Sequence, residues 1–143
     1  MKKFIALALS ALFILGTLTA CGSKTADDGK SSAKVYNVGI CNYVDDASLN
    51  QIVENIKSQL AAIGKEKGVE FNISYDNCNA DSNVLNQIIS NFIADDVDLM
   101  VGVATPVAMA MQTATEGKNI PVVFSAVTDP VSAKLVDSLE APG

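Results

Sequence analysis

The sequence contains no histidine, no arginine and no tryptophan among its 143 residues. Without histidine, it lacks the most common general base and the most common metal ligand of proteins. A serine or cysteine hydrolase that relies on a histidine base is therefore excluded. All ten basic residues are lysine, so the bidentate clamp that arginine offers to carboxylates and phosphates is missing as well.

Positive charge is also scarce, because 16 acidic residues outnumber the ten lysines and the net charge is −6. Nucleic-acid binding needs clustered positive charge, so nucleic acid is excluded as a partner. No histidine, cysteine or acidic cluster has metal-ligand spacing, and no G-x-G-x-x-G follows the first expected strand. Asp45-Asp46 mimics the acidic pair of a phosphoacceptor domain, but Gly102–Ala104 offers no aspartate to accept the phosphate. We expect no metal, no cofactor and no enzymatic activity.

The first 21 residues have the pattern of a secretory leader: Lys2 and Lys3, an apolar run from Phe4 to Leu15, and small residues before Cys21. The run is shorter than the about 20 apolar residues of a membrane span. Leu-Thr-Ala-Cys, residues 18–21, resembles the lipobox of bacterial lipoproteins, which implies cleavage before Cys21 and lipidation, such as palmitate, on that cysteine. An uncleaved membrane anchor is the alternative.

Residues 22–34 contain no large apolar side chain and are rich in glycine, serine, lysine and aspartate, which predicts a flexible tether. If Cys21 carries lipid, Cys41 and Cys78 remain as an even pair. They could form a disulfide in an exported protein, or they could be two small buried side chains.

From residue 35 onward, strand-like and helix-like patterns alternate. Apolar residues at spacings of three and four predict helices, the first capped by Asp45 or Asp46 and ended by Gly64, the second capped by Asp81. Alternating or continuous apolar runs predict strands. The expected strands are 35–41, 69–75, 97–103 and 120–127, and the last two expected helices are 105–116 and 131–139.

This alternation predicts an α/β fold, a doubly wound parallel sheet with strand order 2-1-3-4. The expected organisation is a signal peptide over 1–20, a lipidated cysteine and tether over 21–34, and an α/β lobe over 35–143. A sheet of four strands would stop just after a helix, at residues 141–143, which indicates a truncated chain.

Ligands of open α/β sheets bind at the carboxyl ends of the strands. The loops there are 42–48, 78–83, 104–106 and 125–130. Thr105-Pro106 and Asp129-Pro130 each pair a capping residue with proline, which predicts two helix N-termini at this rim that could hold an anion. Ordinary capping is the alternative.

Other side chains of the same rim favour a charged ligand. Asp129 and the pair Asp45-Asp46 could neutralise an ammonium group, so that the rim would suit an amino acid, or they could be caps and solvated surface. Tyr43 could stack on a flat ligand or pack on the first helix.

Two segments carry a family resemblance: 101–108 (VGVATPVA) and 120–131 (IPVVFSAVTDPV). They resemble the ABC transporter substrate-binding protein family that includes the tryptophan- and tyrosine-binding lipoproteins; residues 42–44 and 141–143 also fit. The resemblance implies a type I periplasmic-binding-protein-like N-terminal lobe, with the second lobe absent. Relatives often carry His-Pro where this chain has Asp45-Asp46, and a rim aspartate favours a different ligand charge.

The resemblance implies an extracytoplasmic lipoprotein, anchored to the cell membrane, that captures a small solute between two lobes and delivers it to an ABC permease and its ATPase. An amino acid, favoured as aromatic, is the implied ligand. A sensory ligand-binding lobe and an exported flavodoxin-like enzyme are the alternatives. The ligand-binding residues expected in this lobe are Tyr43, Ala104, Thr105, Pro106, Ser125, Thr128 and Asp129.

Overall fold

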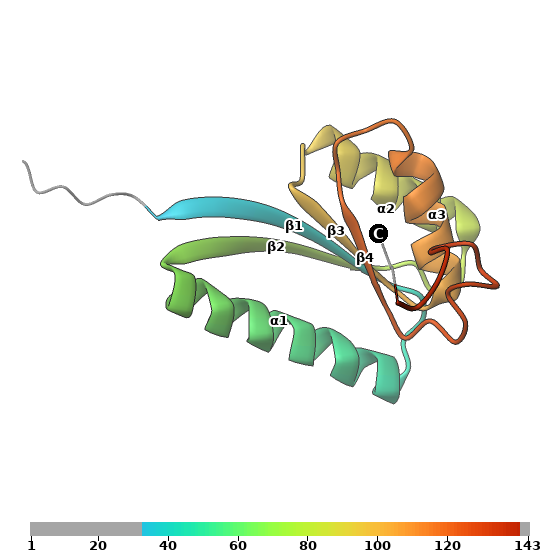
Figure 1. Ribbon diagram of the computed structural model, residues 1–143, viewed down its shortest axis with the longest axis horizontal. Coiled ribbons are helices and arrows are strands. Elements are labelled where there is room, and N and C mark those ends of the chain that lie inside the picture. The colour runs from blue at the N-terminus through green and yellow to red at the C-terminus, as the bar shows by residue number, and fades with distance from the viewer. Residues whose placement is uncertain (1–32, 141–143) are drawn as a thin grey trace, which may run out of the picture. The chain divides into compact units, whose positions relative to one another are not determined.

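The computed structural model describes residues 33–140. The expectations for the leader, for Cys21 and for most of the tether lie outside the described residues. Four parallel strands form one sheet in the order β2-β1-β3-β4 (Figure 1), which confirms the predicted order and fold class. The elements are β1 (Lys34–Asn42), α1 (Ala47–Lys67), β2 (Val69–Asn77), α2 (Ser82–Ala94), β3 (Leu99–Val103), α3 (Thr105–Thr115) and β4 (Val122–Ser125).

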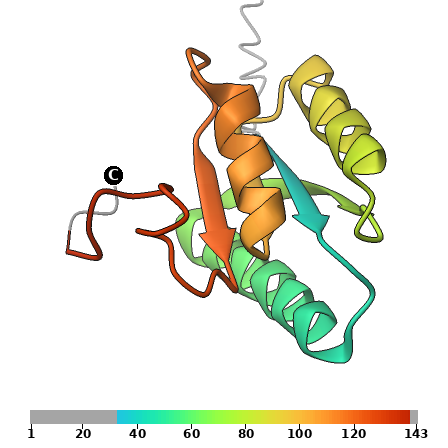
Figure 2. The same cartoon turned by 90° about the vertical axis from the view of Figure 1, so that its right-hand side faces the viewer.

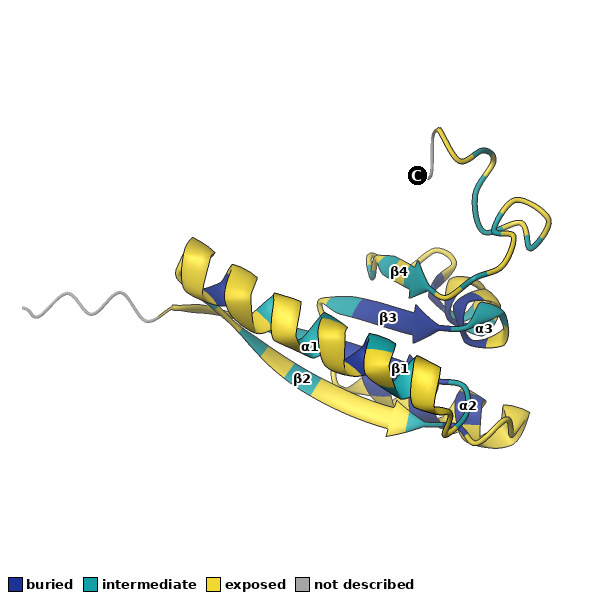
Figure 3. Ribbon diagram, turned by 90° about the horizontal axis from the view of Figure 1, so that it is seen from below, coloured by how far each residue is buried: buried dark blue, intermediate teal, exposed yellow. Residues whose placement is uncertain are grey.

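The sheet is covered on both faces, with α1 on one side and α2 and α3 on the other (Figure 1). Val38, Ile40, Val101 and Val103 point to the α1 face, where they pack with Val53. The opposite cluster lies under α2 and α3 and is formed by Cys41, Cys78, Leu85, Ile88, Ile89, Phe92, Val97, Met100, Val107 and Met111. Figure 3 shows β3 buried and the outer face of α1 exposed. Burial on both faces explains why β3 is a continuous apolar run.

The first helix begins as predicted but ends later. The Asp46 carboxylate accepts hydrogen bonds from the amides of Ser48 and Leu49 at 2.9 and 3.1 Å. Gly64, predicted to end the helix, is instead a buried residue within it. A glycine is needed there because a Cβ would lie 2.8 Å from the Val69 carbonyl oxygen. The helix ends at Gly68, whose left-handed φ of 67° glycine adopts without strain.

The fourth helix, expected over 131–139, does not form. Residues 130–134 make turns, and Lys134 has a φ of 57°, which stops any helix there. A nine-residue helix needs a packed apolar face to be stable. Here Val131 and Leu139 are 42% and 69% exposed, and the other apolar residues of the segment are only half-buried. The strand expected over 120–127 is likewise shorter, because β4 pairs only from Val122 to Ser125.

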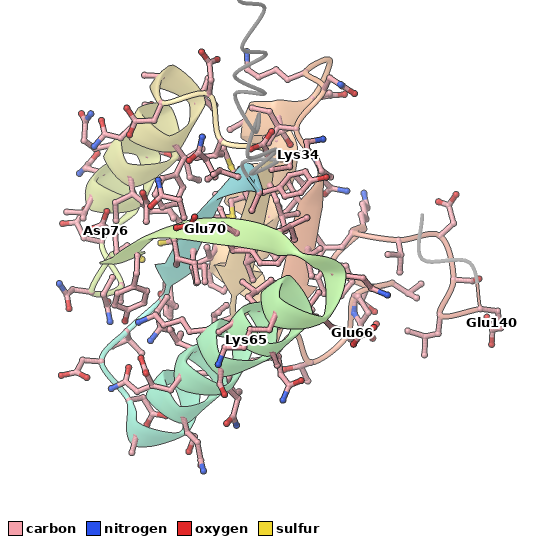
Figure 4. The ribbon with its side chains drawn as sticks, turned by 90° about the vertical axis from the view of Figure 1, so that its left-hand side faces the viewer. Lys34, Lys65, Glu66, Glu70, Asp76 and Glu140 are labelled. Atoms are coloured by element: carbon pink, nitrogen blue, oxygen red, sulfur yellow. The ribbon has the colours of Figure 1, made fainter. Side chains whose placement is uncertain are left out.

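At the other edge of the sheet, β2 carries charged side chains. Figure 4 shows Glu70 and Asp76 on this strand. Charges on an edge strand oppose pairing with a second sheet. Within residues 33–140, no helix is both long enough and apolar enough to cross a membrane.

Candidate functional site

The carboxyl ends of β1, β3 and β4 meet at one rim of the sheet. Asn42 lies opposite Val103, and Val103 lies opposite Ser125. In Figure 2 the arrows of β1 and β4 run in the same direction, with α3 close to β4. The rim therefore brings together Ser125 and the residues that directly follow β1 and β3.

The loop after β3 enters α3 through a strained residue. Ala104, and not the predicted Thr105, is the N-cap of α3, and it adopts φ 82° and ψ 154°, a conformation that side chains other than glycine rarely take. Its amide donates to the Ser125 carbonyl oxygen at 2.9 Å, which ties this loop to β4. Alanine has no side chain that could cap a helix, so the first turn of α3 has no side-chain cap.

Two further residues define this helix start. Thr105 is half-buried and Pro106 is exposed. Gly102 allows α3 to lie close to β3, because a Cβ on it would meet the Ala108 backbone at 3.1 Å. The helix N-terminus, with the positive end of its dipole, is therefore held directly at the rim.

The loop after β1, residues 43–46 and here called the first loop, is held by several hydrogen bonds. Tyr43 is half-buried and packs against the cluster under α2 and α3, and not on α1. Its carbonyl oxygen accepts from the Ala80 amide at 2.7 Å and from the Cys78 thiol at 3.2 Å.

Cys41 and Cys78 are both free thiols and fully buried, so the disulfide considered for them is absent from the structure. Both thiols donate to backbone carbonyl oxygens, Cys41 to that of Asn42 at 3.5 Å and Cys78 to that of Tyr43 at 3.2 Å. Burial, together with the neighbouring Cys78, raises the pKa of the Cys41 thiol to about 12.

The acidic side chains of the rim are engaged by the protein itself. Asp46 caps α1, and Asp45 accepts from the Asn50 side chain at 2.6 Å. Asp129 accepts from the Ser132 amide at 2.9 Å and from its hydroxyl at 2.6 Å, and these bonds hold the pKa of this exposed carboxyl below its usual value. In this structure the aspartates make the local contacts that ordinary capping predicts.

Thr128 and Asp129 lie in an exposed segment beyond β4. Gln112 on α3 donates to the carbonyl oxygens of Lys134 and Leu135 at 3.2 and 3.3 Å, which docks this segment against the helix. Of the predicted residues in this part of the chain, Ser125 is half-buried at the end of β4, whereas Thr128 and Asp129 follow the strand and are exposed. Ser125 also borders an apolar hollow of about 380 Å³ that is otherwise lined by α1.

Asn42 was not expected at the site. It ends β1, is 0% exposed, and its side-chain nitrogen donates to the Val44 carbonyl oxygen at 3.1 Å and to the Asn50 side chain at 3.0 Å. Its side-chain oxygen has no hydrogen-bond partner in the part of the chain that the structure describes. Its place directly after the apolar stretch 38–41 and before the rim loop was the sequence signal for it.

Known proteins resemble this chain in sequence and in structure. A tyrosine-binding protein of Clostridioides difficile strain R20291 is 35% identical over 99% of this chain and 42% of its own length. A Streptococcus pneumoniae ABC domain, solved in complex with L-Trp, is 34% identical with a TM-score of 0.68 over 77% of this chain and 36% of that one. The ligand-free, open structure of CD0873, a substrate binding protein with adhesive properties from Clostridium difficile, is 33% identical with a TM-score of 0.65 over 73% and 35% of the two chains.

The chain thus spans about two fifths of the length of the curated relative that it matches. The relatives are binding proteins and not enzymes, which confirms the expectation of a non-catalytic chain. The model of the family described as ABC transporter substrate binding protein matches residues 37–143, so the chain belongs to that family.

Proposed function

We propose that this chain forms one lobe of an extracytoplasmic solute-binding protein that serves an ABC importer. The whole protein closes a second lobe over the rim, retains a small solute, and delivers it to a permease coupled to an ATPase. Capture by lobe closure needs no covalent chemistry, which agrees with a site that offers hydrogen-bond donors and no catalytic base.

The observation that carries this proposal is the start of α3 at the rim. The first turn has no side-chain cap, and the strained Ala104 holds it beside the end of β4. Pro106 has no N–H and the Ala104 amide is bonded to Ser125, so the donors left in this first turn are the other amides, which no side chain caps. Uncapped amides at the positive end of a helix dipole favour an anion, even in a chain without arginine. A ligand carboxylate fits this position.

An aromatic amino acid is the proposed ligand class. Ala104, Thr105 and Pro106 would surround its carboxylate, Tyr43 would contact its ring, and Ser125 would border it. Thr128 and Asp129 complete the proposed half-site. The names of two relatives, a tyrosine-binding protein and a domain solved with L-Trp, support this class.

Binding of L-tyrosine and L-tryptophan to the protein expressed from its complete gene, measured by titration calorimetry, tests the proposal. Ala104→Asp places a negative charge where the ligand carboxylate would bind, so we expect affinity to fall about 100-fold or more, while Ala104→Asn, which has the same shape without the charge, loses less. Thr113→Ala lies on the same helix away from the rim and serves as the control. Equal affinities for the Asp and Asn variants would contradict an anion site at α3.

The proposed location rests on residues 1–34 and is tested separately. We propose cleavage after Ala20, a lipid on Cys21 and a tether to residue 34 that holds the α/β lobe 35–143 clear of the cell membrane. Cys21→Ser is expected to abolish incorporation of labelled palmitate, and Ser23→Ala is expected to leave it unchanged. Equal labelling of the Cys21→Ser variant would exclude a lipoprotein anchored at that residue.

A further inference from the structure

The first loop is fixed along its whole length by hydrogen bonds. The carbonyl oxygen of Asn42 accepts from the Cys78 amide at 3.0 Å, and that of Tyr43 accepts from the Ala80 amide at 2.7 Å. The carbonyl oxygen of Val44 accepts from the Asn42 side chain at 3.1 Å. Three consecutive carbonyl groups are thus held, so the backbone that carries Tyr43 has a defined position.

Asn42 is the link between this loop and α1. Its side-chain nitrogen has two hydrogens, and both are used, one on Val44 and one on the Asn50 side-chain oxygen at 3.0 Å. Asn50 passes the connection on, because its own nitrogen donates to Asp45 at 2.6 Å. One buried carboxamide therefore ties the end of β1 to Val44 directly and to Asp45 through Asn50.

The same carboxamide is a poor choice for stability alone. Asn42 is 0% exposed, and its side-chain oxygen finds no partner among residues 33–140. A buried acceptor without a donor loses its hydration and gains nothing in return. The two bonds that the side-chain nitrogen donates are thus made at the cost of one buried oxygen without a partner among the described residues.

We propose that Asn42 is a positioning residue of the ligand site, which holds Tyr43 at the rim through its bonds to Val44 and Asn50. The part of this inference that concerns ligand binding rests on the proposed function. The part that concerns the effect of Asn42 on the first loop does not. Asn42 does not touch the solute; it acts through the first loop, opposite Val103 and next to the start of α3.

Amide hydrogen exchange tests the effect on the loop without any ligand. In Asn42→Leu, the protection of the Ser48, Leu49 and Asn50 amides against exchange is expected to fall by about tenfold. The natural protein must break the two Asn42 side-chain bonds before this segment opens locally, and the variant lacks them, so its local opening costs less free energy. Protection in β3 should fall less than at these amides, because the lost bonds lie in the first loop and at the start of α1. Asn50→Ala removes the bond that Asn42 donates to it and its own bond to Asp45 but keeps the bond to Val44, and it should lower protection at the same amides. Asn72→Leu is the matched control, because it removes a side-chain bond to Asn37 on the β1–β2 pair, outside the first loop.

Ligand affinity, measured on the protein expressed from its complete gene, tests the functional part. If the natural protein binds L-tyrosine or L-tryptophan, Asn42→Leu should weaken binding about tenfold and Asn72→Leu should not. Unchanged exchange in Asn42→Leu and Asn50→Ala would overturn the inference, and so would faster exchange with unchanged affinity. A natural protein that binds neither amino acid would instead refute the proposed ligand class, and the exchange data would still decide the role of Asn42.

Discussion

Ala104 combines the least favourable backbone conformation of the rim with a central position in it. Its φ of 82° and ψ of 154° lie in a region that glycine occupies freely and alanine does not. The residue is nevertheless held there, because its amide bonds to Ser125 and its carbonyl oxygen accepts from Ala108. The strain coincides with the proposed anion site.

Ala104→Gly is therefore expected to stabilise the fold. Removing the Cβ relieves the strain, and after the greater entropy of glycine in the unfolded chain is subtracted, we expect a gain of about 1 kcal/mol in the free energy of unfolding. Urea denaturation measures it. Ala110→Gly, within the regular part of α3, should lose about 1 kcal/mol instead. A loss at both positions would show that Ala104 is not strained.

The buried thiols make a prediction about reactivity and pH. Iodoacetamide at pH 8 should modify neither Cys41 nor Cys78 in the folded protein, and both after unfolding in urea without a reductant, as read by mass spectrometry of their peptides. Because burial raises the Cys41 pKa from 9.0 to about 12, its contribution to stability is complete below pH 9.0 and is lost as the pH rises toward 12. If both thiols resist modification in urea until a reductant is added, they are bridged, and the free-thiol description is wrong.

Among the elements, β1 and α2 are packed unusually close. A Cβ on Gly39 would lie 2.6 Å from the Phe92 ring, in a cluster where Phe92 is 2% exposed. Because Gly39 has no side chain, the Phe92 ring of α2 can lie directly on β1, the strand whose end carries Asn42 and the first loop. The distance between α2 and β1 therefore depends on Gly39.

Gly39→Ala should destabilise the protein by about 2 kcal/mol, since the ring must shift within a filled core. Phe92→Leu removes the clash, so the double variant should lose less stability than the sum of the two single variants. Thermal or urea unfolding of all four proteins completes the cycle. Strictly additive losses would mean that Gly39 and Phe92 do not constrain each other.

At the scale of the whole molecule, the rim supplies one side of the proposed site. It gathers the ends of β1, β3 and β4, and the aspartates around it are satisfied by their own caps and turns. A solute held only by this surface would remain largely exposed to water. Closure of a second lobe over the rim would bury it.

Closure predicts a change in overall dimensions. For the protein expressed from its complete gene, small-angle scattering should show a smaller radius of gyration when L-tyrosine or L-tryptophan is added, and no change with glycine. The reason is that only a ligand with contacts to both lobes favours the closed state. Calorimetric binding without any change in dimensions would speak against capture by closure.

The sequence by itself determined the parallel α/β architecture, its strand order, a first cap at Asp45 or Asp46 and a second at Asp81, because these follow from local periodicity, capping side chains and crossover handedness. The structure assigned the first cap to Asp46. It also indicated the family through residues 101–108 and 120–131. Those features depend on neighbours in the chain, which a sequence displays directly.

The tertiary structure decided what depends on neighbours in space. It extended α1 past Gly64 to the left-handed cap at Gly68, and it left residues 131–139 without a helix, with Lys134 at a φ of 57°. It placed Ala104 and not Thr105 at the cap, and it left Cys41 and Cys78 as buried free thiols. The role proposed for Asn42 rests on the structure, since an unpaired buried oxygen is a property of packing and not of sequence.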